Sequence, residues 1–159
     1  MELLYCVCYY AFLGVFFFVA GRHMARHTFD YDAPPFRLLP LEQDGQIYKR
    51  IGVASWQAKV PDMSKIFKKL MPAKKMDGRP DKQTLILMIQ ETCVAELIHA
   101  LLCVFGLAAL WIWPGWGGVI VWLVYCVLGN LPYIIIQRYN RPRLIKLLRL
   151  CLIREERKK

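Results

Sequence analysis

The stretch "ETCVAELIHA", residues 91–100, places two carboxylates and an imidazole at the start of a run that carries no further charge until Arg138. At 100° per residue on a helix, Glu96 and His99 fall on one face, and Glu91 lies about 80° from His99. A carboxylate beside an imidazole fixes the tautomer of the ring and stabilises the imidazolium that forms when the ring takes a proton from a hydroxyl. We therefore predict His99, Glu96 and Glu91 as catalytic residues, with His99 as the general base and Glu96 orienting it.

A second polar face follows on the next predicted helix, and it comprises Asn130, Tyr133, Gln137 and Arg141. If the two helices are antiparallel and turn near residues 114 and 115, equal depth is expected for three pairs: His99 with Asn130, Glu96 with Tyr133, and Glu91 with Arg138. A charged group at the centre of a membrane helix costs ~2.5 to 3.5 kcal/mol, so such a cluster is by default a functional site. The alternative is helix assembly, in which Glu91 pairs with Arg138 and Asn130 contributes an interhelical hydrogen bond of ~0.6 to 2 kcal/mol.

The composition indicates a lipid environment for about half of the chain. Hydrophobic residues make up 57% of the 159 residues and the mean hydropathy is +0.30, yet the formal net charge is +10. An apolar part facing lipid and a basic part facing anionic head groups reconcile these values. Residues 3–20, and each arm of a helical pair over about residues 95–138 that breaks at "WPGWGG", have the length that crosses ~30 Å of hydrocarbon. We predict an all-α integral membrane protein with about three transmembrane helices and additional interfacial amphipathic helices.

Four segments follow from this pattern: an N-terminal transmembrane anchor (1–21), a cytoplasmic loop with an interfacial basic part (22–82), a transmembrane hairpin with the polar site (83–140) and a basic amphipathic C-terminal helix (141–159). Thirteen of the 22 Lys and Arg lie in residues 22–82 and the other nine in residues 138–159. By the positive-inside rule, both basic segments are cytoplasmic and the N-terminus lies on the outer side of the cell membrane. The alternative for the first segment is a cleaved signal peptide, which carries positive charge before its apolar run, whereas only Glu2 precedes this one.

Two basic segments have the spacing of helices that lie in the head-group layer. In residues 51–70, lysines alternate with apolar and aromatic side chains such as Trp56 and Phe67. The tail repeats the pattern, with an apolar stripe beside a basic stripe of Arg143, Lys146, Arg149 and Arg154. Each basic residue near an anionic leaflet contributes roughly 1 kcal/mol, so anionic lipids are expected partners. The alternative for residues 51–70 is a small soluble cap packed on itself.

Other chemistries and partners have weaker support. The Glu96-x-x-His99 pair resembles half of a di-iron site, but that site needs a second such pair and two further glutamates, so we predict no metal. Nucleic acid is a partner that the positive charge could attract, but the chain carries no binding motif for it, and we predict none.

The stretches "ETCVAELIHA" and "GNLPYIIIQRYNRPRLIKLLR", with "YKRIGVASWQAKVPD" before them, resemble the glycosyl-4,4'-diaponeurosporenoate acyltransferase family of small bacterial membrane proteins. The resemblance runs from about Tyr48 to Arg149. The positions that match the family's pattern are Trp56, Lys59, Pro61, Asp62, Glu91, Glu96, His99, Asn130, Gln137, Arg138, Asn140 and Arg141. Gln57 departs from the pattern, because the family often has a lysine there.

The resemblance implies an acyltransferase that esterifies the sugar of a glycosylated carotenoid or similar glycolipid with a fatty acyl chain. The implied substrate-binding residues are Trp56, Lys59, Asp62, Asn130, Tyr133, Gln137, Arg138, Asn140 and Arg141. In this scheme Asn130, Gln137 or backbone amides hold the developing oxyanion, and Arg138, Arg141 and Lys59 bind an anionic donor. No cofactor is expected, since the donor, an acyl-CoA, acyl-carrier protein or phospholipid, is a co-substrate. The competing hypothesis is a non-catalytic membrane subunit that organises lipid-modifying enzymes, and a thin three-helix bundle is compatible with a homo-oligomer.

Overall fold

Helices make up most of the chain in a computed structural model that describes residues 1–60 and 80–157. No strand occurs in these two ranges. Three helical stretches are long and apolar enough to cross a membrane, and they are Glu2–His23, Lys82–Ile112 and Trp116–Glu156. The fold therefore confirms the predicted all-α class with three helices of spanning length.

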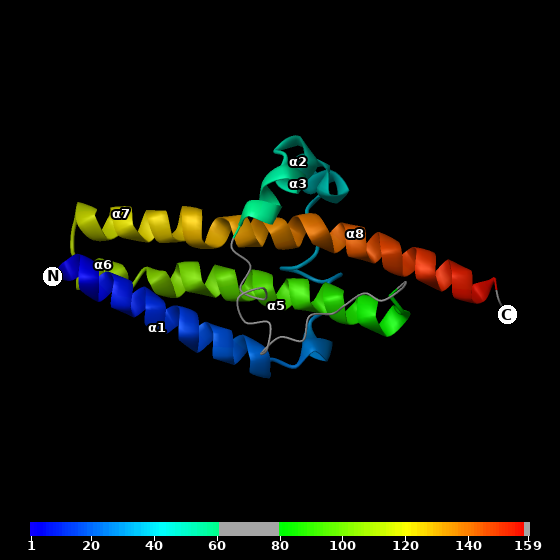
Figure 1. The fold of residues 1–159 in the computed structure, drawn as a ribbon, viewed down its shortest axis with the longest axis horizontal. Coiled ribbons are helices and arrows are strands. Elements are labelled where there is room, and N and C mark those ends of the chain that lie inside the picture. The colour runs from blue at the N-terminus through cyan, green and yellow to red at the C-terminus, as the bar shows by residue number, and fades with distance from the viewer. Residues whose placement is uncertain (61–79, 158–159) are drawn as a thin grey trace.

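The long helices lie side by side, with α5 between the other two (Figure 1). Their elements are α1 (Glu2–His23), α5 (Lys82–Gly106), α6 (Ala109–Ile112), α7 (Trp116–Val124), the π-helical segment η4 (Tyr125–Asn130) and α8 (Leu131–Glu156). Leu13 and Phe17 of α1 pack against Leu102 of α5. The two helices approach so closely that a Cβ added at Gly21 would overlap Ile98. Because α5 also packs along α8, it contributes to both interfaces of the bundle.

The hairpin turns at "WPGWGG", as the sequence predicts. α6 ends before Pro114 and α7 begins after Gly115, which has a φ of 91°, a conformation that glycine adopts without steric cost. At the other end of α5, the Asp81 carboxylate accepts a hydrogen bond of 3.0 Å from the Thr84 N–H and caps the helix. The hairpin therefore starts at Lys82, next to its predicted boundary at residue 83.

A π-helical turn, η4, interrupts the second arm of the hairpin just before α8. Pro132 follows this turn and has no N–H, so it cannot donate to the Leu128 carbonyl as a regular helix requires. The turn widens, and the Leu131 N–H donates to the Cys126 carbonyl instead. A π turn holds an extra residue. The residues of α8 therefore lie closer to the hairpin turn than a count along an unbroken helix gives.

The segment between α1 and α5 has short helical elements in its described part. They are η1 (Arg26–Thr28), η2 (Pro40–Gly45), α2 (Gln46–Arg50), α3 (Val53–Trp56) and η3 (Gln57–Lys59). α2 and α3 stand on the side of α8, where Tyr48 and Val53 pack on Tyr139 (Figure 1). Residues 61–70 of the predicted interfacial stretch lie outside the described residues. In the described part, Tyr48 and Val53 are buried against Tyr139 of α8, while Ile51 is exposed, and the interfacial position of this segment stays a prediction.

The C-terminal segment differs from the separate surface helix predicted for residues 141–159. It continues α8 in line with the hairpin arm as far as Glu156 (Figure 1). Its apolar stripe packs against α5, with Leu148 on Leu85 and Ile89. α5 extends beyond the end of α1 and covers part of this stripe, while Leu147 and Ile153 stay exposed.

Candidate functional site

Three polar side chains form the layer between α5 and α8 that lies nearer the hairpin turn: His99, Asn130 and Tyr133, here called the histidine layer. His99 Nδ1 lies 2.9 Å from Asn130 Oδ1, which confirms that these residues share one depth. The Asn130 amide nitrogen donates to the Tyr125 carbonyl at 3.0 Å, so the amide oxygen is the atom that faces the imidazole. His99 Nδ1 therefore carries the proton and donates it to this oxygen. The imidazole also stacks on Tyr133, with the ring centroids 4.5 Å apart.

The second ring nitrogen of His99, Nε2, is left with its lone pair by this arrangement. No hydrogen bond within residues 1–60 and 80–157 engages Nε2, and the side chain is only half-buried. A neutral imidazole with one nitrogen fixed and the other open is the arrangement of a general base. Asn130, at the end of the π turn, contacts the imidazole at the place that we predicted for Glu96.

A second layer, here called the arginine layer, lies one turn further along α5 and comprises Thr92, Glu96, Arg138, Arg141 and Glu42. Arg141 is 0% exposed. Its Nε donates to Thr92 Oγ1 at 2.9 Å, and its two terminal nitrogens reach the Phe36 carbonyl, the Thr92 carbonyl and the Glu96 carboxylate. Four of the five N–H groups of this buried guanidinium donate to partners inside the protein, so Arg141 is mainly an internal hydrogen-bond donor.

Arg138 is held in the same way by two carboxylates. It donates to both oxygens of Glu42, at 2.6 and 2.7 Å, and to Glu96 Oε1. It also reaches the Pro35 and Arg37 carbonyls, each at 3.3 Å. The proline-rich loop before α2 is thereby fastened to α8.

Glu42 is the carboxylate that the loop contributes. Burial works to raise the pKa of this carboxyl, but hydrogen bonds from Arg138, from Tyr48 and from the Leu39 backbone favour the charged form and lower the pKa to about 2. The reverse holds for Tyr48, because burial and the hydrogen bond to Glu42 raise the pKa of its hydroxyl to about 12. At neutral pH, Glu42 is therefore an anion that neutralises part of the charge of the arginine layer.

Two predicted pairings differ in the structure. Glu96 contacts Arg138 and Arg141 rather than His99. Glu91 is exposed and pairs with Arg26, after α1, at 3.1 Å instead of with Arg138. The extra residue of the π turn and the length of the arginine side chains both bring the α8 charges to Thr92 and Glu96, which lie closer to the hairpin turn than simple counting gives.

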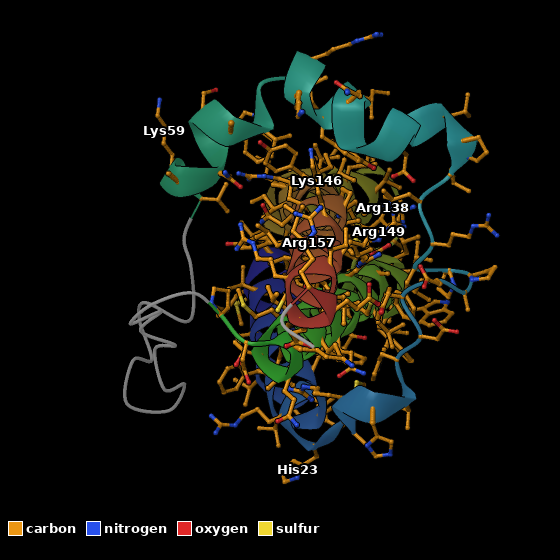
Figure 2. The ribbon with its side chains drawn as sticks, turned by 90° about the vertical axis from the view of Figure 1, so that its right-hand side faces the viewer. His23, Lys59, Arg138, Lys146, Arg149 and Arg157 are labelled. Carbon is orange, nitrogen blue, oxygen red and sulfur yellow. The ribbon has the colours of Figure 1, made fainter. Side chains whose placement is uncertain are left out.

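The remaining predicted substrate-binding residues are dispersed. Trp56 is half-buried in the cluster of Tyr48, Val53 and Tyr139. Lys59 is exposed and lies on the outer side of the short helices, away from Arg138 (Figure 2). Asp62 lies outside the described residues.

On α8, Gln137 is half-buried, and Asn140 accepts a 3.5 Å hydrogen bond from Arg143. The structure therefore brings His99, Asn130 and Tyr133 together in one layer and Glu96, Arg138 and Arg141 in another. It does not bring Trp56, Lys59 or Glu91 to either layer.

Sequence reasoning did not find Glu42 or Tyr48 as members of the site. Glu42 stands in a proline-rich loop without any helical periodicity to place it. Charge balance was the available signal, since two arginines next to a single inward carboxylate, Glu96, require a second anion when they are buried.

The chain is similar to a family of known proteins over the region that holds both polar layers. The family model for glycosyl-4,4'-diaponeurosporenoate acyltransferases matches residues 30–150. The chain belongs to this family. The matched region contains both polar layers and the loop that supplies Glu42, and it leaves out all of α1.

Relatives with the same name come from Staphylococcus aureus. The protein of strain MRSA252, named glycosyl-4,4'-diaponeurosporenoate acyltransferase, is 30% identical over 125 residues, which are 77% of this chain and 73% of that protein. The protein of strain USA300 is 54% identical over 35 residues, 22% of this chain and 21% of that protein. No solved structure gives a significant match. Membership of the family supports an acyltransferase activity.

Proposed function

We propose that the chain is a membrane O-acyltransferase that moves a fatty acyl group onto a sugar hydroxyl of a glycolipid, such as a glycosylated carotenoid. The observation that carries this proposal is the open Nε2 of His99, held toward the bundle by Asn130. The family supplies the reaction class, and its name supplies the type of acceptor.

The proposal places the three long helices in the bacterial cell membrane, with the N-terminus outside. Its support is the distribution of charge, because the hairpin turn carries no Lys or Arg and the basic residues cluster toward the opposite end of the bundle. In this orientation the arginine layer lies toward the cytoplasmic side, and the histidine layer lies one turn deeper.

In the proposed step, the sugar hydroxyl gives its proton to His99 Nε2 as its oxygen attacks the acyl carbonyl carbon. A new C–O ester bond forms, and the bond from the acyl carbon to the donor's sulfur or oxygen breaks. The imidazolium then returns the proton to the leaving thiolate or alkoxide, so protons and electron pairs balance without a further reagent. Asn130 accepts from Nδ1–H throughout, which stabilises the charged ring as it forms.

The arginine layer has a different role in this scheme, because its hydrogen bonds are used within the protein. It fastens the loop before α2 to α8 and keeps Glu96 buried. Because its hydrogen bonds go to partners inside the protein, the arginine layer also favours the second candidate, a non-catalytic membrane subunit in which polar residues serve helix assembly. Gln137, near the histidine layer along α8, stays a proposed oxyanion donor, while Asn130 has both ends of its amide in use.

Substituting His99→Gln separates the two candidates. The chain is expressed in cells that make the glycosylated carotenoid, and lipid mass spectrometry quantifies the acylated product per unit of membrane protein. We expect a loss of about 10²- to 10⁴-fold, since that is the range that a general base contributes. The matched control is His27→Gln, an exposed histidine after α1, which leaves the product unchanged.

Product formation by His99→Gln at the level of the parent would overturn the assignment of the base. Loss of the protein from the membrane, rather than loss of product per molecule, would instead support the helix-assembly role.

A further inference from the structure

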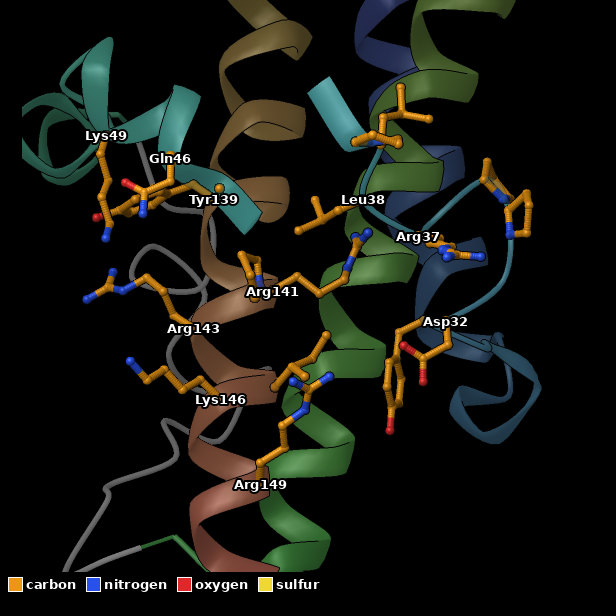
Figure 3. Close-up of a pocket in the computed structure, with 18 residues that line it drawn as sticks. Asp32, Arg37, Leu38, Gln46, Lys49, Tyr139, Arg141, Arg143, Lys146 and Arg149 are labelled. Atoms are coloured by element: carbon orange, nitrogen blue, oxygen red, sulfur yellow. The ribbon is translucent and has the colours of Figure 1, made fainter. Parts of the chain in front are cut away.

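A basic pocket of about 1330 Å³ lies along the part of α8 that follows the arginine layer, below the loop that joins α1 to α2 (Figure 3). Its volume is above the roughly 300 to 1000 Å³ of typical small-ligand sites. It can therefore hold a ligand of cofactor size with room for an attached chain.

The charge of the pocket is one-sided. Six basic side chains line it, namely Arg37, Lys49, Arg141, Arg143, Lys146 and Arg149, and Asp32 is the acidic residue among the lining residues. Arg141 donates its hydrogen bonds to partners in the protein interior, but the other five side chains are exposed. None of those five has an ion pair within residues 1–60 and 80–157. Such a concave group of like charges focuses a positive potential, and a polyanion relieves the repulsion among them.

The basic side chains lie on two walls of the pocket, and this arrangement suits a ligand with several phosphate oxygens. Arg143, Lys146 and Arg149 follow one another at three-residue steps on α8, and each step turns about 60° around the helix. Arg143 and Lys146 point to the flank where Lys49 lies (Figure 3). Arg149 lies toward the other flank (Figure 3). Guanidinium and ammonium groups on opposing walls are the usual means of binding phosphate oxygens.

The pocket is physically joined to the candidate catalytic layers. Arg141 lines the pocket and donates to Thr92 and Glu96, three residues before His99. Arg138 fixes the loop wall through the Arg37 carbonyl. A ligand anchored in the pocket therefore lies beside the polar face that leads to His99.

We infer that this pocket binds the phosphorylated head of the acyl donor, an inference that rests on the proposed function. The shared chemistry is an anionic, phosphate-bearing group attached to an acyl chain. It can come from the nucleotide part of an acyl-CoA or from the headgroup of an anionic phospholipid. This assigns donor recognition to Arg37, Lys49, Arg143, Lys146 and Arg149 in place of Arg138, Arg141 and Lys59, which were expected from the sequence.

The test measures binding rather than turnover, so it is independent of the proposed reaction. The full chain is placed in nanodiscs of phosphatidylcholine, and the affinity for coenzyme A is determined by titration calorimetry. In a second arm, native mass spectrometry measures retention of phosphatidylglycerol over phosphatidylcholine. Binding of coenzyme A identifies the nucleotide source, and selective retention of phosphatidylglycerol identifies the lipid source.

Two pocket variants and one control accompany the parent. Lys146→Gln/Arg149→Gln alters the helix wall, and Arg37→Gln/Lys49→Gln alters the loop wall. Arg154→Gln/Arg157→Gln removes the same charge from exposed positions of the same helix end that do not line the pocket. Each pocket variant is expected to weaken binding by about tenfold or more, because it removes two charge-assisted contacts, and the control by less than about twofold.

Several results would overturn the inference. They are binding of neither probe, equal weakening by the control, and weakening by only one wall. Binding of an acidic carrier protein through the pocket, with neither small probe bound, would also overturn it. His99→Gln is expected to bind like the parent, so loss of turnover with intact binding tests the proposed function alone.

Discussion

The histidine layer and the arginine layer lie one helical turn apart between the same two helices, yet they differ in what they leave open. In the arginine layer, Arg138 and Arg141 donate nine hydrogen bonds to Glu42, Glu96, Thr92 and the loop before α2. In the histidine layer, His99 uses one ring nitrogen, and no hydrogen bond within residues 1–60 and 80–157 engages the other. Groups whose hydrogen bonds are all internal suit a structural role, whereas a group with an open lone pair is the one to test for chemistry.

The comparison shows that residue type alone does not assign a role in a membrane bundle. A buried arginine is usually considered a binding group, but these two are neutralised by carboxylates of the same chain. Exposed bases on the next turns of α8 have no such carboxylates in the described residues, and they are better placed for an anionic ligand.

The largest effect on stability is expected from Arg141→Met. Removing one partner of a buried ion pair leaves uncompensated charge and costs about 3 to 5 kcal/mol. The free energy of unfolding in detergent, measured by SDS titration, should fall accordingly, whereas Arg154→Met at an exposed site of the same helix changes it by less than about 0.5 kcal/mol. The double variant Arg141→Met/Glu96→Met should lose less than the sum of the single losses. Equal stability of the Arg141 and Arg154 variants would contradict the role of the arginine layer.

A smaller effect, on activity, is expected from Asn130→Ala. The imidazole loses the acceptor that fixes its tautomer, and product formation should fall by about 10- to 100-fold, part of what the general base supplies. Asn130→Asp keeps an oxygen acceptor and should retain more activity than the alanine variant. If both variants lose activity equally and in proportion to the amount of folded protein, Asn130 serves helix packing rather than orientation of His99.

An effect with a pH signature is expected from Glu42→Gln. The pKa of Glu42 is lowered from 4.5 to about 2 in the folded chain, so its stabilising contribution is full above the ordinary value and is lost as the pH falls through 4.5 toward 2. The parent should therefore lose thermal stability in detergent between about pH 5 and pH 3 more steeply than Glu42→Gln does. Glu91→Gln is the matched control, because its pair with Arg26 is exposed and worth about 0 to 1 kcal/mol. Parallel pH curves for the parent and the Glu42 variant would rule out this contribution.

Much of the fold was predictable because its signals are local. The apolar runs gave the long helices, and "WPGWGG" gave the turn, since proline and glycine end helices wherever they occur. Counting from this turn placed His99 level with Asn130, which the 2.9 Å contact confirms. The count went wrong beyond Pro132, because the π turn adds a residue that hydropathy does not reveal.

The sequence by itself determined the helices, the turn and the family resemblance. It also determined that His99 and Asn130 share the histidine layer. Each of these depends on periodicity or on neighbours in the chain. Only the tertiary structure decided which carboxylate meets which base. Glu42 lies 96 residues from Arg138, and a long-range pair of this kind depends on how a loop packs rather than on any repeat. The same packing decided that Arg141 is buried while Arg143, Lys146 and Arg149, on the same helix, face a pocket.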